Sequence, residues 1–95
     1  MNIGEIKSGM SNVSLQAKVI DISETRDVMT RYGKRVVADA LLEDETGQVK
    51  LTLWQDQIER INVGDTVDIG GAFVTEFRGE IQISVPRSGK IEVVK

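Results

Sequence analysis

The sequence contains no cysteine and no histidine, and its 95 residues include one proline and four aromatic side chains. Without cysteine the chain can form no disulfide, no thiolate nucleophile and no cysteine-based zinc site. Without histidine it lacks the commonest general base and the commonest metal ligand. These absences exclude triad, thiol and zinc-hydrolase enzymes. We therefore expect a protein that is not an enzyme, needs no cofactor or metal, and has no small-molecule substrate.

Long apolar runs are also missing. No stretch approaches the roughly 20 apolar residues that a membrane span requires, and the start of the chain has neither the basic region nor the apolar run of a secretion signal. These features predict a soluble protein of the cytoplasm, with no membrane partner.

The charge is −3, from 12 basic and 15 acidic residues. Domains that bind nucleic-acid backbones tend to be basic, so the total argues against such a partner. The distribution is more informative. Residues 26–35 carry four basic side chains and one acidic, whereas residues 36–69 carry two basic and eight acidic. The positive charge is thus concentrated in one short segment.

Apolar residues alternate with polar ones along most of the chain, which predicts β-strands. The predicted strands cover residues 13–19, 36–42, 49–54, 67–77 and 81–85. Gly70-Gly71 predicts a bulge or sharp bend inside the fourth strand. Only Gln55–Ile61 has helical spacing. Residues 91–94 form either a sixth strand or a tail that packs on the others.

Three strands, a short helix and two more strands predict an all-β fold. This order is that of the five-stranded OB fold, a small Greek-key barrel with one short helix between strands three and four. An SH3-like barrel is the main competitor, but its helical turn falls late in the chain. We expect one domain over residues 1–95, with residues 1–12 as an N-terminal segment and 86–95 as a C-terminal extension on or beside the barrel.

Most of the aromatic side chains are predicted to lie outside the core. Trp54 alternates with Leu51 and Leu53, so it shares the outer face with Lys50 and Thr52. The core is then left to aliphatic side chains. The alternative is that Trp54 packs under the helix.

Phe73 and Phe77 lie on the face opposite Val74, and Tyr32 lies in the basic segment. Exposed aromatics beside cations suit single-stranded nucleic acid, because each stacked base contributes about 1–3 kcal/mol and the cations contact phosphates. The alternative is that Phe73 and Phe77 cover one end of the barrel.

The basic segment is expected to be a loop between the first two strands. In an OB fold this loop and the loop between the last two strands flank the ligand face. Arg78 lies in that second loop. The candidate phosphate contacts are Arg26, Arg31, Lys34, Arg35, Lys50 and Arg78. The alternatives are a solvated basic loop and a surface arginine in a turn.

Four segments carry a resemblance to a known family: Ile3–Met10, Asp44–Gly47 with Lys50–Trp54, Val63–Asp65, and Phe73–Gly79. With these the sequence resembles the archaeal single-OB-fold single-stranded DNA-binding proteins, whose relatives include the human sensor-of-single-stranded-DNA subunits. It is also similar to OB domains of archaeal replication protein A. The resemblance covers nearly the whole chain.

The resemblance implies base stacking on Trp54, Phe73 and Phe77. It also implies contacts from the first loop by Arg26, Val28, Thr30 and Arg31. Two features differ from the family pattern. Phe73 stands where the family often has tryptophan, which offers a larger stacking surface. Family members also commonly carry a flexible tail after the barrel, whereas this sequence ends at Lys95, so tail-mediated recruitment of partners is not carried over.

We therefore expect binding of single-stranded DNA with little sequence preference, over roughly 4–6 nucleotides, in replication, recombination or repair. The predicted site is Trp54, Phe73, Phe77, Arg26, Val28, Thr30, Arg31, Tyr32, Lys34, Arg35, Lys50, Thr52 and Arg78. We also expect protein partners from the replication and repair machinery. One alternative is a protein-interaction subunit of a replication-protein-A-like complex, with the aromatics as interface anchors. The other is single-stranded RNA, because stacking alone does not distinguish the sugar.

Overall fold

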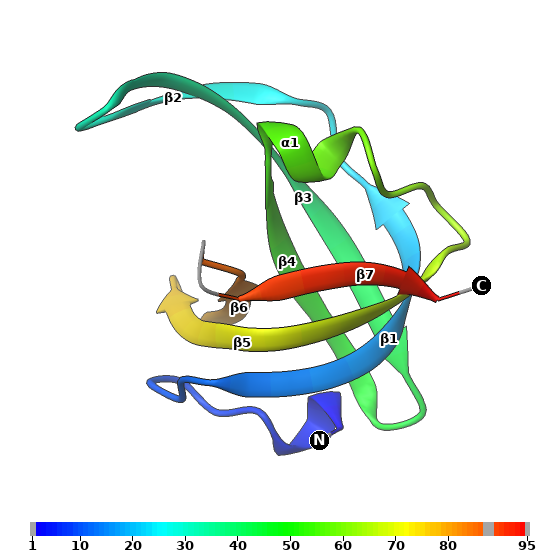
Figure 1. Cartoon of the computed structure of the whole chain (residues 1–95). Coiled ribbons are helices and arrows are strands. Elements are labelled where there is room, and N and C mark those ends of the chain that lie inside the picture. The colour runs from blue at the N-terminus through cyan, green and yellow to red at the C-terminus, as the bar shows by residue number, and fades with distance from the viewer. Residues whose placement is uncertain (1, 87–88, 95) are drawn as a thin grey trace.

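The computed structural model describes residues 2–86 and 89–94, apart from the side chain of Phe77. It contains seven strands, a 3-10 turn and one short helix (Figure 1). The strands are β1 (Val13–Ile22), β2 (Arg26–Thr30), β3 (Gly33–Asp44), β4 (Gly47–Trp54), β5 (Thr66–Phe77), β6 (Glu80–Ser84) and β7 (Lys90–Val94). The helical elements are η1 (Ile3–Glu5) and α1 (Gln55–Ile58).

Five of the strands form a closed ring. Their order is β1-β3-β4-β6-β5, and β5 pairs again with β1. Along the chain the five ring strands follow one another as β1, β3, β4, β5 and β6. The helix α1 lies between the third of them, β4, and the fourth, β5. This arrangement is the OB fold that the sequence predicts. The other two strands lie off the ring, β2 pairing with β3 and β7 with β5 (Figure 1).

The core inside the ring is aliphatic. Its buried side chains are all isoleucine, leucine, valine or alanine among the described residues. Leu51 and Leu53 on β4 are fully buried, as are Val67 on β5 and Ile83 on β6. The residues directly before and after each of them point outward, because successive side chains in a strand point to opposite faces. The two-residue pattern therefore predicted the inward face correctly.

The bulge expected at Gly70-Gly71 is confirmed. The pairing of β1 with β5 changes register between Val13, which faces Ala72, and Leu15, which faces Ile69. Gly71 has φ of 72°, in the left-handed region that favours glycine. The strand continues through the bulge, so β5 is one element of 12 residues. β5 pairs with β7 up to the bend and with β6 after it, while β1 pairs with it on both sides of the bend.

Two expectations about local structure are wrong. Residues 26–35 are not a loop: β2 and the start of β3 form a hairpin in which Arg26 pairs with Val37 and Thr30 with Gly33. Its turn contains Gly33 with φ of 110°. The hairpin projects from the ring and buries little, so its sequence lacks the alternation that marks a strand with one face in the core.

The helix is also shorter than the predicted Gln55–Ile61. It ends at Ile58, after which the backbone N–H of Arg60 bonds the carbonyl of Gln57. Ile61 turns into the core, where it is 3% exposed. Burial of this side chain redirects the chain toward β5, so the helical spacing of Ile58 and Ile61 does not extend the helix. Among the described residues, no helix is long and apolar enough to cross a membrane.

The N-terminal segment is hydrogen-bonded to the turn between β3 and β4. One carboxylate, that of Asp44, accepts hydrogen bonds from the backbone N–H of Ile3 at 2.8 Å and of Thr46 at 2.7 Å. It also accepts from the Thr46 hydroxyl at 2.6 Å and the Gly47 N–H at 3.2 Å. Desolvation works to raise the pKa of Asp44, but these hydrogen bonds outweigh it and hold the pKa below its ordinary value. Ile3 and Ile6 then pack against the core.

Candidate nucleic-acid interface

The outer face of β3 and β4 carries the residues that the sequence assigned to a binding site. Cross-strand partners point to the same side of a sheet. Val37 pairs with Trp54 and Asp39 with Thr52, so all four lie opposite the core-facing residues. Arg26 faces Val37 and Val28 faces Arg35, so the hairpin continues the same surface.

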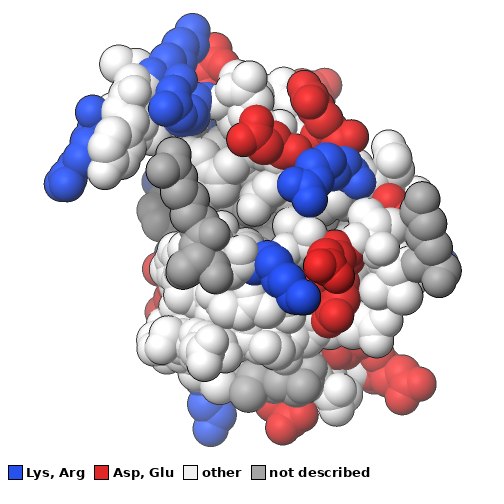
Figure 2. Space-filling view, viewed as in Figure 1, with Lys and Arg blue, Asp and Glu red and all other residues white. Residues whose placement is uncertain are grey.

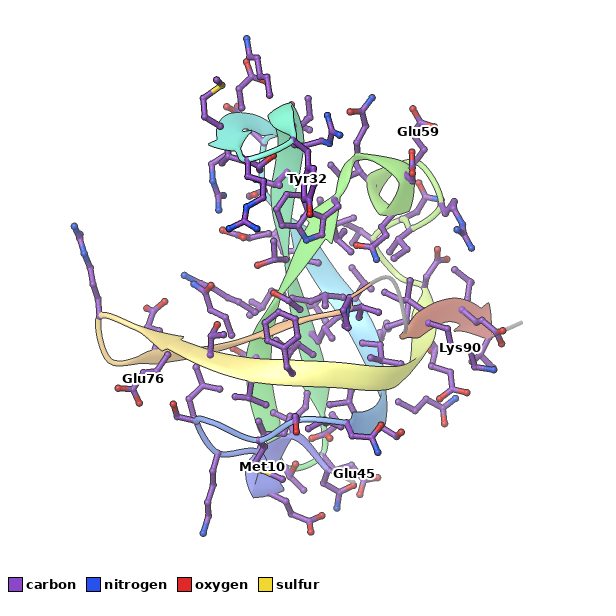
Figure 3. The ribbon with its side chains drawn as sticks, turned by 60° about the vertical axis from the view of Figure 1, so that its left-hand side comes forward. Met10, Tyr32, Glu45, Glu59, Glu76 and Lys90 are labelled. Atoms are coloured by element: carbon purple, nitrogen blue, oxygen red, sulfur yellow. The ribbon has the colours of Figure 1, made fainter. Side chains whose placement is uncertain are left out.

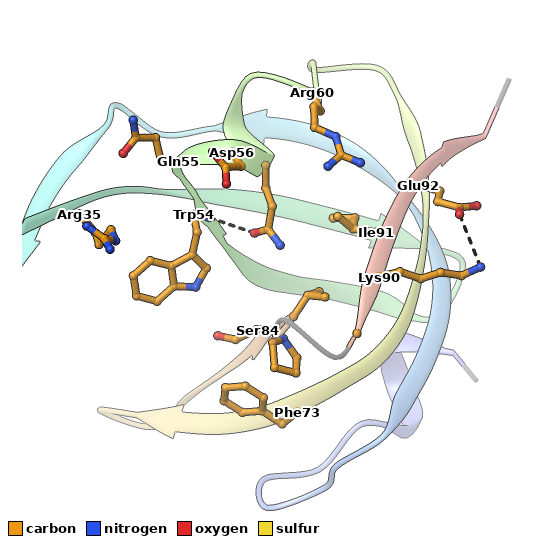
Figure 4. Close-up of a pocket in the computed structure, with 14 residues that line it drawn as sticks. Arg35, Trp54, Gln55, Asp56, Arg60, Phe73, Ser84, Lys90, Ile91 and Glu92 are labelled. Atoms are coloured by element: carbon orange, nitrogen blue, oxygen red, sulfur yellow. Dashed lines mark hydrogen bonds and ion pairs between the residues drawn. The ribbon is translucent and has the colours of Figure 1, made fainter. Parts of the chain in front are cut away.

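Trp54 is the last residue of β4 and stands directly before α1. Its side chain is 36% exposed, and its backbone N–H donates to Gln57 Oε1 at 3.0 Å. Val37, its cross-strand partner, is only 2% exposed although it lies on the outer face. The indole points into a hollow that it helps to line (Figure 4).

Phe73 follows the bulge in β5 and is 38% exposed. Its neighbours Ala72 and Val74 are buried, so the bulge leaves the phenyl ring on the outside. Phe73 and Trp54 come from different strands and border the same hollow (Figure 4). Phe77 is the final residue of β5, paired with Glu80, and its side chain lies outside the described structure.

The hollow is a groove of about 970 Å³, which we call the main groove. Trp54, Phe73 and Arg35 border it on the predicted face. It then continues between α1 and β7. Its lining consists of Arg35, Trp54, Gln55, Asp56, Gln57, Arg60, Phe73, Ser84, Val85, Pro86, Gly89, Lys90, Ile91 and Glu92.

Most of the main groove was missed by the sequence reasoning. Asp56 of α1 lines the groove, although it was not among the predicted site residues. The side of the groove formed by β7 was not predicted either, because β7 reaches this place only by pairing with β5. No local sequence pattern reports such a contact between distant segments.

A smaller hollow of about 620 Å³ lies beside Trp54 under the hairpin. It is bordered by Thr30, Tyr32, Arg35 and Trp54. Tyr32 sits in the hairpin turn and is 77% exposed (Figure 3). The hairpin thus brings a second aromatic side chain and a guanidinium next to the indole. Thr30 stabilises the turn by donating to the Gly33 carbonyl at 2.8 Å and accepting from the Tyr32 N–H at 3.2 Å.

Several of the predicted phosphate contacts already have carboxylate partners. Arg26 Nη1 forms an ion pair with Asp39 Oδ2 at 3.0 Å, and Lys50 Nζ forms one with Glu80 Oε2 at 2.7 Å. The hydrogen bond and the charge of Glu80 raise the pKa of Lys50. This sheet surface is therefore close to neutral despite its basic side chains.

The remaining cations lie around the sheet. Lys34 pairs with Asp27 at 3.1 Å, and it faces Met29 on the side of the hairpin away from Arg35. Arg35 donates to the Lys34 carbonyl at 3.2 Å. Arg31 stands in the hairpin turn, and Arg78 begins the turn between β5 and β6 with φ of 53°. Figure 2 shows basic side chains gathered over the hairpin and acidic ones over other parts of the same face.

Residues 6–93 match the family described as "Single-stranded DNA binding protein Ssb-like, OB fold". The chain belongs to this family. The family is one of DNA-binding proteins rather than enzymes, as the lack of catalytic residue types led us to expect.

Among curated proteins, the chain is 37% identical to the single-stranded DNA binding protein Ssb of Saccharolobus solfataricus. That match covers 94% of this chain and 60% of the relative. The chain is also 26% identical to replication factor A of Methanothermobacter thermautotrophicus, over 92% of this chain and 11% of the relative. The chain thus spans less than two thirds of either protein.

Solved structures show the same fold. The OB domain of Ta0387 from Thermoplasma acidophilum has a TM-score of 0.86 and 24% identity, covering 99% of this chain and 85% of that one. A replication protein A heterotrimer bound to single-stranded DNA has a TM-score of 0.77 and 20% identity, covering 99% of this chain and 24% of that one. At these identities the likeness concerns the fold alone.

Proposed function

We propose that this Ssb-like chain binds single-stranded DNA with little sequence preference, in replication, recombination or repair. The observation that supports this most is the position of Trp54 and Phe73. Both are exposed and border one groove, while the core of the described structure contains no aromatic side chain. Aromatic residues are normally used for core packing because each buries a large apolar area. Their exposure here favours a binding role.

Bases stack on Trp54, Phe73 and Phe77 in this proposal. Stacking accepts any base, since every base has a flat π-face, and it contributes about 1–3 kcal/mol per base. Tyr32 lies next to Trp54 across the smaller hollow and provides a further surface for a base.

Phosphates are contacted by the predicted basic side chains, of which Lys34 lies on the other side of the hairpin from Arg35: Arg26, Arg31, Lys34, Arg35, Lys50 and Arg78. Val28, Thr30 and Thr52 complete the contact surface on the hairpin and β4. The ion pairs of Arg26, Lys34 and Lys50 reduce the gain from each phosphate contact, because the phosphate replaces or shares a carboxylate. Stacking therefore supplies the larger part of the affinity.

Fluorescence of Trp54 tests the proposal, because it is the single tryptophan of the chain. We would titrate oligo-dT, oligo-U and a duplex at several salt concentrations. Quenching by oligo-dT that weakens as salt rises is the expected result. Absence of quenching at low salt would exclude stacking on Trp54 and favour a protein-interaction role. An equal response to oligo-U would extend the substrate to RNA.

Replacement of Trp54 by alanine should weaken binding of labelled oligo-dT by about 1–3 kcal/mol, because one stacking surface is lost. Fluorescence anisotropy of the labelled oligonucleotide measures this. Trp54→Phe should retain part of the affinity. Val63→Ala is the matched control, because Val63 is exposed and borders neither hollow. Binding by Trp54→Ala as tight as that of the original chain would refute the stacking role.

A further inference from the structure

The main groove continues well past Trp54 and Phe73. On one side α1 and the residues after it provide Gln55, Gln57 and Arg60. On the other side β7 provides Lys90 and Ile91. Figure 4 shows Arg60 facing Ile91 and Lys90, with Trp54 and Phe73 toward the other end of the groove. A ligand stacked on that pair therefore meets an open path between α1 and β7.

The floor of this part of the groove is apolar. It is formed by Val85, Pro86 and Ile91, of which Val85 and Ile91 belong to the core and are 4% and 8% exposed. An apolar floor accommodates the flat face of a base. The rim carries the amides of Gln55 and Gln57, which suit the hydrogen-bonding edges of a base. Gln57 uses its Oε1 for the Trp54 N–H, which leaves its amide nitrogen to donate to a ligand.

The charges of this segment fit a phosphate on one side only. Arg60 is exposed at the rim and, within the part of the chain that the structure describes, forms no ion pair, unlike Arg26 and Lys50 on the sheet. Lys90 Nζ forms an ion pair with Glu92 Oε1 at 3.5 Å, and Glu92 also lines the groove. A phosphate is therefore attracted to Arg60 and is repelled by Glu92 on β7 and by Asp56, which lines the α1 side of the same groove.

We propose that the groove between α1 and β7 is a second nucleotide-binding segment of the site. The strand leaves the aromatic pair, places a base over Val85, Pro86 and Ile91, and sets a phosphate beside Arg60. This inference rests on the proposed function. It assigns a binding role to residues that the sequence patterns did not select, and it lengthens the footprint beyond the sheet surface.

A length series tests this segment. Affinities of the original chain, Arg60→Ala and Lys7→Ala for labelled oligo-dT of increasing length would be measured by anisotropy. Lys7→Ala removes the same charge from an exposed position that lines neither hollow. We expect Arg60→Ala to match the original chain on short oligonucleotides and to lose the affinity gain on longer ones. Its salt slope should fall by about 0.7, the loss of one phosphate contact on a single strand.

The opposite change provides a second variant. Glu92→Gln removes a carboxylate from the groove, so it should tighten binding of the longer oligonucleotides only. Thermal melts of all variants would confirm that each is folded. Unchanged length dependence in both Arg60→Ala and Glu92→Gln, alongside weakened binding by Trp54→Ala, overturns this inference alone. Unchanged binding of every length by Trp54→Ala overturns the proposed function and this inference together.

Discussion

At the scale of single residues, two carboxylates on the sheet surface restrain the proposed phosphate contacts. Asp39 holds Arg26 and Glu80 holds Lys50. All four side chains are at least partly exposed to solvent, which screens their charges, so each pair adds little to stability. These pairs are too weak to be needed for the fold. Their main effect is to lower the positive potential that an approaching phosphate meets.

Neutralising either carboxylate should therefore tighten binding. We expect Asp39→Asn and Glu80→Gln each to raise the affinity for oligo-dT and to steepen the salt slope by up to about 0.7, because one cation becomes available to a phosphate. Glu45→Gln is the control, since Glu45 lies in the turn between β3 and β4, away from both hollows. Weaker binding by either variant would show that the carboxylate itself contacts the DNA.

The orientation of single residues was largely predictable, and their partners were not. The buried Leu51 and Leu53 fix the phase of β4, so Trp54 had to point outward. The partner of Lys50 is 30 residues away on β6, which runs parallel to β4. Such a pair depends on how the ring closes, and the sequence around Lys50 carries no sign of it.

At the scale of elements, Asp44 joins η1 to the β3–β4 turn. Its pKa is held below the ordinary value, so its contribution to stability is complete above the unfolded pKa of about 3.9 and is lost as the pH falls through the folded pKa. We expect Asp44→Asn to lower the melting temperature near pH 7. The difference from the original chain should shrink below about pH 4.

Thermal melts between pH 2.5 and 7 would measure this difference. Glu43→Gln is a suitable control, because Glu43 is exposed and adjacent to Asp44 in β3 but does not bond η1. A constant difference between Asp44→Asn and the original chain across the whole range would contradict the assignment of the acid-sensitive contacts to Asp44.

The elements of the ring were predictable because each has one buried face. The hairpin formed by β2 and the start of β3 was not, since it projects beyond the ring and has no core-facing side to impose alternation. The main groove was also only half predictable. Its Trp54 side follows from the alternation of side chains in β4. Its β7 side depends on the pairing of β7, the last strand, with β5, which joins segments that are distant in the sequence.

At the scale of the whole molecule, the net charge of −3 and the ion pairs predict a shallow salt dependence. The six proposed phosphate contacts would give a slope of log K against log salt of about −4 on a single strand if each formed fully, and the ion pairs of Arg26, Lys34 and Lys50 should make the observed slope shallower. Titrations from low to moderate salt would measure it. A slope steeper than about −4 would mean that backbone charge, rather than stacking, dominates the affinity.

The aliphatic core separates the two tasks of the molecule by residue type. In many proteins a change that improves a binding site weakens the fold, because the same side chains serve both. Here the fold depends on isoleucine, leucine, valine and alanine inside the ring, and recognition depends mainly on a few rings and cations outside it, with Val85 and Ile91 at the groove floor as the shared residues. Substitutions of the outer residues can therefore change the affinity for a single strand with little effect on folding. This property suits such a domain to reuse in new assemblies.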